Sequence, residues 1–118
     1  MTKPAEYTSV IDQLVEICQS GQGRVGAQKA TRGVWNPNQH ALLTAEHRSA
    51  NELLAKLTDP EREVLANLLH SEFVAGVFET LKTLEVHRLA PFESGYEGEP
   101  AQDFIGRLNG WSWPELLA

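Results

Sequence analysis

The longest regular hydrophobic pattern in the chain lies between residues 58 and 89. It begins with a helix start signal, because Thr58 and Glu61 have the spacing of a capping box and Pro60 stands in the first turn, where its missing N–H costs nothing. Apolar residues then recur at steps of three and four, which indicates one buried face of a helix. The members of this stripe are Leu65, Leu68, Leu69, Phe73, Val77, Leu81 and Leu84. We therefore expect a long central helix with Phe73 in the core.

Two helices are predicted before this one in the N-terminal third. Residues 4–20 place apolar side chains on one side of a helix that Gly21 can end, and a second, shorter helix is expected over 26–31. The segment between them, 21–26, has the letters of a GxGxxG dinucleotide motif. Such a site needs its glycines between a strand and a helix, with an acid about twenty residues later, and this sequence offers neither. We interpret 21–26 as a helix terminator and flexible linker.

An anion site near this motif is an alternative that the sequence leaves open. Arg24, Lys29 and the unpaired N–H groups of the next helix start could together hold an anion. No acid stands between Ile17 and Ala45, so the segment carries only positive charge.

The third predicted helix covers residues 39–57 and follows a turn at 35–38. Asn38 is expected to cap this helix. Only three residues, 58–60, separate it from the long helix, so the two should form an antiparallel hairpin. Its inward side chains should be Leu42, Leu43, Ala50, Leu53, Leu54 and Leu57.

The C-terminal part is irregular and aromatic. The helical register stops at Pro91, and 91–100 is predicted to be a loop from its Gly, Pro and Ser content. A last short helix is expected over 100–109, in which Asp103 and Arg107 would pair at four residues. Five of the nine aromatic residues lie in the last 27 positions, and they either hold an irregular tail against the helices or form a binding patch. These five are Phe92, Tyr96, Phe104, Trp111 and Trp113.

These patterns predict an all-α protein in which residues 1–118 form a single domain. We expect a small bundle of four to five helices with one long central helix and an irregular aromatic C-terminal segment. An unbroken helix of about 30 residues would be ~45 Å long, whereas a compact domain of this size is roughly 35 Å across. The helix should therefore either bend near Gly76 or have its overhang covered by the C-terminal segment or a second subunit.

Charge and cysteine content narrow the environment. The net charge of −6 argues against nucleic acid, because phosphate binding depends on clustered Lys and Arg. The chain has no apolar stretch of about 20 residues and no signal-peptide pattern, so we expect no membrane partner and a cytoplasmic location. The single cysteine, Cys18, lies in phase with the apolar side of the first predicted helix and should be inert.

No catalytic or metal-binding pattern is present in the sequence. The four histidines are His40, His47, His70 and His87, and none has a second ligand three or four residues away in the arrangement that a metal site uses. There is also no GxSxG nucleophile elbow. We therefore predict no metal, no cofactor and no catalytic residues, and we lean towards a protein that is not an enzyme.

The second half of the chain resembles a known kind of family. From Leu57 to Pro114, a central LTDPEREVLANLL helix is followed by an acid-Phe-x-x-Arg stretch and a Trp-x-Trp-Pro ending. This combination resembles a family of small uncharacterised bacterial proteins. The resemblance implies a bacterial origin and a shared fold, without an assigned activity. The matching positions are Asp103, Phe104, Arg107, Gly110, Trp111, Trp113 and Pro114.

Taken together, these features favour a non-enzymatic helical module that binds another protein or itself, with a homodimer as one form. The alternative is a small-molecule or anion-binding domain, either a binding protein or an enzyme, with its pocket between the long helix and the C-terminal segment. The sequence identifies neither the pathway nor the partner or ligand. The candidate binding residues are His70, Glu72, Asp103, Arg107, Trp111 and Trp113.

Overall fold

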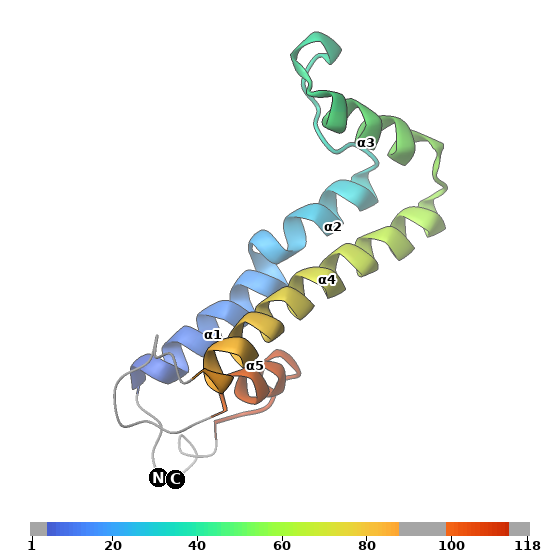
Figure 1. Cartoon of the computed structure of the whole chain (residues 1–118). Helices are drawn as coiled ribbons and strands as arrows, with labels where there is room; N and C mark the ends of the chain where they lie inside the picture. Colours follow the sequence, from blue (N-terminus) through green and yellow to red (C-terminus); the bar gives the residue numbers. More distant parts are fainter. Residues whose placement is uncertain (1–4, 88–98, 114–118) are drawn as a thin grey trace.

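The computed structural model describes residues 5–87 and 99–113, and all regular structure in these two ranges is helical (Figure 1). The all-α fold class is confirmed. Five α-helices and one 3-10 turn follow one another as α1 (Ala5–Ser20), α2 (Gln22–Arg32), η1 (His40–Leu42), α3 (Ala45–Lys56), α4 (Asp59–Val86) and α5 (Pro100–Leu108).

The helices form an elongated body of 55 × 26 × 20 Å. α1 and α2 lie end to end and run antiparallel to α4, while α5 packs against α1 and the second half of α4 (Figure 1). The compact outline expected from chain length is wrong, because α1 and α2 lie end to end and together extend along α4 (Figure 1). α4 therefore has helical neighbours along its whole length, and it does not overhang the body.

The predicted hairpin between the third helix and the long helix is also wrong. α3 turns away from α4 after the short connection at 57–58, and α2 is the antiparallel neighbour of the first half of α4 (Figure 1). The expected helix 39–57 is divided into η1 and α3. Thr44 caps α3, since its hydroxyl accepts from the His47 N–H at 3.1 Å, and Asn38 does not serve as the cap.

The start of α4 confirms the predicted capping box. The Glu61 N–H donates to the Thr58 hydroxyl at 3.3 Å, and the Glu61 carboxylate accepts from the Thr58 N–H at 2.8 Å. Backbone and side-chain hydrogen bonds to Thr58 lower the pKa of Glu61. The helix then continues unbroken for 28 residues, which at 1.5 Å per residue is about 42 Å.

The GxGxxG-like segment is helical and forms no linker, which corrects the prediction. α2 starts at Gln22, directly after Gly21. A Cβ on Gly23 would lie 2.6 Å from the Cys18 Cα and 2.9 Å from the Phe73 Cδ1. Gly23 is therefore needed where α2 follows α1 and packs closely against Phe73 of α4, because any side chain there would collide with its neighbours.

Over residues 5–87 and 99–113, the buried apolar side chains gather in two hydrophobic clusters. One lies at the α5 end and is built around Tyr7, Ile11, Cys18, Leu81, Phe104 and Trp113. The other lies between α2, α3 and the first half of α4, around Ala27, Ala30, Leu54 and Ala66. Phe73, expected in the core, is only half-buried and packs against the edge of the first cluster.

Three leucines predicted to face inward are exposed. Leu42, Leu53 and Leu68 keep 73%, 53% and 59% of their surface in solvent. The buried residues of α2 are all small, namely Gly23, Ala27 and Ala30, so α2 covers only a narrow strip of α4 and leaves Leu68 exposed.

Asn51 makes three hydrogen bonds to the connection between α2 and α3. The Asn51 side-chain oxygen accepts from the N–H groups of Trp35 and Asn36 at 2.7 and 3.0 Å, and its amide nitrogen donates to the Asn36 carbonyl at 2.8 Å. The turn predicted at 35–38 thus folds back onto α3. The predicted loop at 91–100, with Phe92 and Tyr96, lies almost wholly outside the described residues, as does Pro114.

Candidate functional site

His70 links the long helix to α1. Its Nε2 donates to the Cys18 carbonyl oxygen at 3.0 Å. That carbonyl is one of the last four in α1, which lack the full set of intrahelical donors, so the histidine satisfies a helix end. Cys18 is completely buried, and burial raises the pKa of its thiol. The geometry gives both side chains a structural use.

Glu72 lies on a different side of α4 from His70. A step of two residues along an α-helix turns the side-chain direction by about 200°. Glu72 therefore points away from His70, and it is exposed. It borders a shallow groove of about 440 Å³ between α1 and α4, which also includes Leu14, Gly76 and Val77. The structure therefore does not bring the two candidate residues together.

Asp103 and Arg107 reach α1 instead of forming the predicted pair within their own helix. Asp103 accepts a hydrogen bond from the Tyr7 hydroxyl. The Arg107 Nε lies 2.6 Å from one oxygen of Asp12, and the Trp113 Nε1 donates to the other oxygen at 3.1 Å. The sequence reasoning missed Tyr7 and Asp12, because no local spacing relates α1 to a helix almost a hundred residues later.

The two tryptophans of the ending have different environments. Trp113 is 1% exposed and meets Tyr7 and Trp111 edge to face, with ring centroids 6.0 and 5.2 Å apart. Trp111 keeps 38% of its surface in solvent, and its carbonyl accepts from Arg107. Of the two readings of the aromatic tail, the geometry of Trp113 matches a side chain that holds the tail against the helices.

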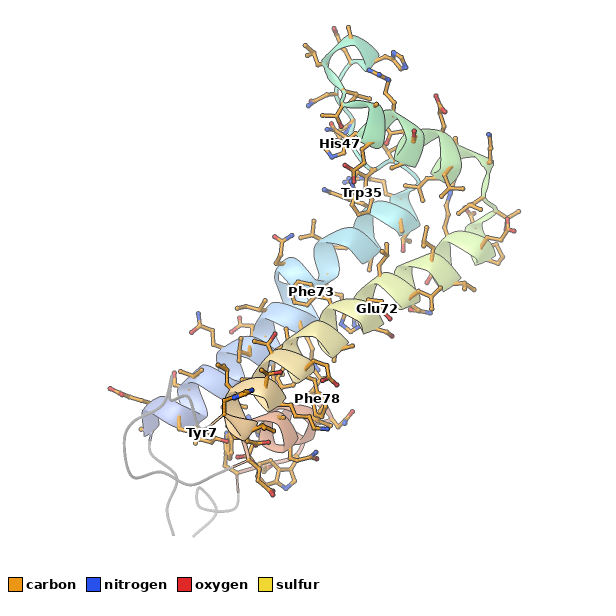
Figure 2. All side chains as sticks on the ribbon, viewed as in Figure 1. Tyr7, Trp35, His47, Glu72, Phe73 and Phe78 are labelled. Carbon is orange, nitrogen blue, oxygen red and sulfur yellow. The ribbon has the colours of Figure 1, made fainter. Side chains whose placement is uncertain are left out.

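An open, mainly apolar groove of about 480 Å³ lies between α4 and α5. In Figure 2, Phe73 points towards the junction of α1 and α2, whereas Phe78 lies on the side of α4 near α5. The groove occupies the place expected for a pocket beside the C-terminal segment, but it contains His70 without Asp103 or Arg107. Its main walls are His70, Val74, Ala75, Phe78, Ile105 and Leu108.

A second apolar stripe continues from this groove along α4. Val64 and Leu68 are 60% and 59% exposed, and Ser71 and Ala75 are also exposed. The Lys82 ammonium lies 5.9 Å from the centre of the half-buried Phe78 ring. We call Val64, Leu68, Ser71, Ala75, Phe78 and Lys82 the outer face of α4. Its four- and three-residue spacing is visible in the sequence, but the sequence analysis predicts a single buried face, the stripe through Leu65 and Leu69.

The two basic side chains considered for an anion site at the glycine-rich segment contact neighbours within the fold. The Arg24 Nε donates to the Gln19 carbonyl at 3.2 Å, and the Lys29 ammonium lies 4.8 Å above the Trp35 ring. Both side chains are thus directed to neighbours within the fold. Over the two described ranges, no group of three or more His, Cys, Asp or Glu side chains is placed to hold a metal ion.

The comparison with known families covers nearly the whole chain. Residues 1–115 match a family of unknown function, DUF6547. The chain belongs to this family. The DUF6547 match includes α1 and α2 as well as the second half, to which the sequence resemblance was confined. No curated protein and no solved structure matches the chain. Among the described helices of this DUF6547 protein, none is both long and apolar enough to cross a membrane.

Proposed function

We propose that this chain is a non-enzymatic protein-binding module of the bacterial cytoplasm that acts through the outer face of α4. The observation that carries the proposal is the exposure of Val64 and Leu68, at 60% and 59%, on a helix whose opposite side is packed against α2. Burying a valine or leucine side chain gains about 1.5–3 kcal/mol. A partner that covers both side chains and the adjoining groove would therefore be stabilised on the protein by this burial.

The surroundings of the outer face support binding of a protein. Val64 and Leu68 continue into the groove walls Val74, Ala75 and Phe78, so the apolar surface extends over several turns of α4. Contiguous apolar surface of this kind marks interaction sites more often than scattered exposed side chains do. An extended strip suits a helix or another elongated surface.

The polar candidate residues support a non-enzymatic role. His70 donates a hydrogen bond to the Cys18 carbonyl, and Arg107 donates one to Asp12. Asp103 accepts from Tyr7. Each of these contacts joins two helices, which accounts for the residues without a substrate.

The second candidate function is the binding of a small apolar molecule in the groove between α4 and α5. Its volume of about 480 Å³ favours this alternative, because ligand pockets commonly measure about 300–1,000 Å³. His70 and Gln102 would be the polar groups at its edge.

Site-specific photocrosslinking in the source cells tests the proposal. A photoreactive amino acid replaces Leu68 in one variant and Leu53, which is similarly exposed on α3, in the matched control. We expect discrete protein adducts from position 68 and weak, diffuse products from position 53. Equal products from both positions, or none from position 68, would contradict a protein-binding outer face.

The small-molecule alternative has its own readout. A native mass spectrum of the gently purified chain would then carry a fixed added mass, and Val74→Trp, which fills the groove, would remove it. A spectrum without added mass, together with adducts at position 68, would leave protein binding as the supported function.

A further inference from the structure

The outer face of α4 is symmetric in its spacing, and its four middle residues are also symmetric in side-chain size. Its residues follow at steps of 4, 3, 4, 3 and 4 positions, which read the same in both directions. In the middle, the larger Leu68 and Phe78 flank the small Ser71 and Ala75. The centre of this pattern falls at the level of Phe73, close to the middle of Asp59–Val86. A two-fold axis at that level would therefore bring the larger residues of one copy opposite the larger residues of the other, and the small residues opposite the small ones.

We propose that the occupant of the outer face is a second copy of this chain, packed with its α4 antiparallel about a two-fold axis at the level of residue 73. The inference rests on the proposed protein-binding function and names its partner. Leu68 of each copy would meet Phe78 of the other, and Ser71 would meet Ala75. Steps of three and four residues form the seam along which two helices pack at a shallow angle, and small residues at its centre let the backbones approach.

The groove beside α5 makes this contact self-complementary. Val64 and Leu68 stand out from the first half of α4, whereas the groove is hollowed beside its second half. The antiparallel arrangement brings the exposed leucine of one copy over the other copy's groove, between Phe78 and Ile105. Both copies make the same contact, which is the defining property of a closed two-fold interface.

The charges at the two ends of the face select the antiparallel orientation. Lys82 stands at the C-terminal end, and the exposed Asp59 and Glu61 stand in the first turn. With antiparallel helices, the aliphatic stem of Lys82 covers the second copy's Val64, and the ammonium points towards Glu61 one turn earlier. Parallel helices would instead place lysine beside lysine and glutamate beside glutamate, at a cost in free energy.

The area available on α4 shows that α5 must take part. A helix about 42 Å long and about 10 Å wide offers on the order of 420 Å² in projection. Specific interfaces bury roughly 600–1,000 Å² on each partner. The walls that α5 adds through Ile105 and Leu108 extend the contact towards this range, which ties the second copy to the groove as well as to the helix.

Engineered disulfides test both the partner and its orientation. One preparation of the protein carries Ser71→Cys, and a second preparation, with a distinguishable mass, carries Ala75→Cys. Both positions are exposed, so both variants should keep the fold. A disulfide needs Cα atoms about 4.4–6.8 Å apart. Antiparallel packing therefore predicts that mild oxidation of the mixture gives mainly the 71–75 cross-product. Ser49→Cys, on the exposed side of α3, is the matched control, and the buried native Cys18 should not react.

Each outcome decides a separate point. A dominant 71–75 product, with a dimer mass for the unsubstituted chain in light scattering, supports the inference. Dominant 71–71 and 75–75 products would overturn the antiparallel arrangement. A monomer mass without any excess of disulfide over Ser49→Cys would overturn the second copy. In that last case, adducts of other proteins at position 68 in cells would still uphold the proposed function, whereas their absence would remove both.

Discussion

Asp12 and Arg107 lie 95 positions apart in the chain, and their side chains form an ion pair of 2.6 Å. The second oxygen of the same carboxylate accepts from Trp113. One aspartate of α1 therefore holds both α5 and the segment that follows it. Because α5 is one wall of the groove beside the outer face, this pair also maintains the shape of the candidate site.

Replacing Asp12 should test this link. Asp12→Asn removes the ion pair and weakens the bond to Trp113, and we expect a loss of about 1–2 kcal/mol of unfolding free energy, since charged hydrogen bonds contribute about 1.5–3 kcal/mol and partial exposure reduces this. Urea unfolding measures the loss. The control is Glu16→Gln, which neutralises an exposed acid one turn further along α1. Equal stability of the two variants would show that the pair does not hold α5.

The two glycines Gly23 and Gly76 should respond to alanine in opposite directions. At Gly23 a Cβ would lie 2.6 Å from the Cys18 backbone, so Gly23→Ala should cost about 1–3 kcal/mol as an overpacked site. At Gly76 no atom beyond the adjoining turns of its own helix lies within 4 Å of the added Cβ, so Gly76→Ala should gain up to about 1 kcal/mol from helix propensity. Chemical denaturation of both variants provides the measurement. A stabilised Gly23→Ala would contradict the close packing at Gly23, and a destabilised Gly76→Ala would contradict the open space at Gly76.

The capping box should make stability depend on pH in the acidic range. Hydrogen bonds to Thr58 lower the pKa of Glu61 in the folded chain, so the folded state binds the proton less readily than the unfolded state. This stabilisation is fully present above the ordinary glutamate range, about pH 4 to 5, and is lost as pH falls through the lowered pKa. Unfolding free energies of the parent and Glu61→Gln should therefore differ at neutral pH and converge in acid. A difference that stays constant down to pH ~3, below that ordinary range, would argue against the charged cap.

Glu72 should oppose self-association. In the antiparallel pair, Glu72 of both copies lies on the same flank, near the two-fold axis, so the two carboxylates repel. Like-charge pairs on helices cost about 0.2–0.5 kcal/mol, so Glu72→Gln should raise the association constant up to about twofold. Sedimentation equilibrium of the parent and the variant measures this effect. Weaker association in the variant would place Glu72 in an attractive contact and would move the axis.

Local signals in the sequence predicted the parts of this fold that depend on neighbouring residues. The capping box at Thr58 and Glu61, the end of α1 before Gly21 and the short last helix are examples, because their hydrogen bonds and periodicity lie within a few positions. The all-α class follows from these elements. The assignment of Leu68 to the core failed, because α4 carries apolar residues on two sides and periodicity alone does not say which side α2 covers.

Contacts between distant segments lay beyond local reasoning. The sequence predicts a helix terminator and linker at 21–26, whereas Gly23 lies in α2 and packs closely against Cys18 and Phe73, contacts that no local signal reveals. The candidate residues Asp103 and Arg107 were paired with each other by their spacing. Their partners Tyr7 and Asp12 become visible only when α1 and α5 are side by side.

Sedimentation equilibrium of three purified chains tests the central claim that the outer face of α4 joins two copies. Leu68→Glu places a charge on the face, and Leu53→Glu makes the same change at a similarly exposed leucine of α3. Both side chains stand largely in solvent in the single chain, so circular dichroism should show full helicity for both variants. We predict that the parent and Leu53→Glu are dimers, while Leu68→Glu is a folded monomer. A monomeric parent, or a Leu68→Glu chain that dimerises as tightly as the parent, would contradict the claim.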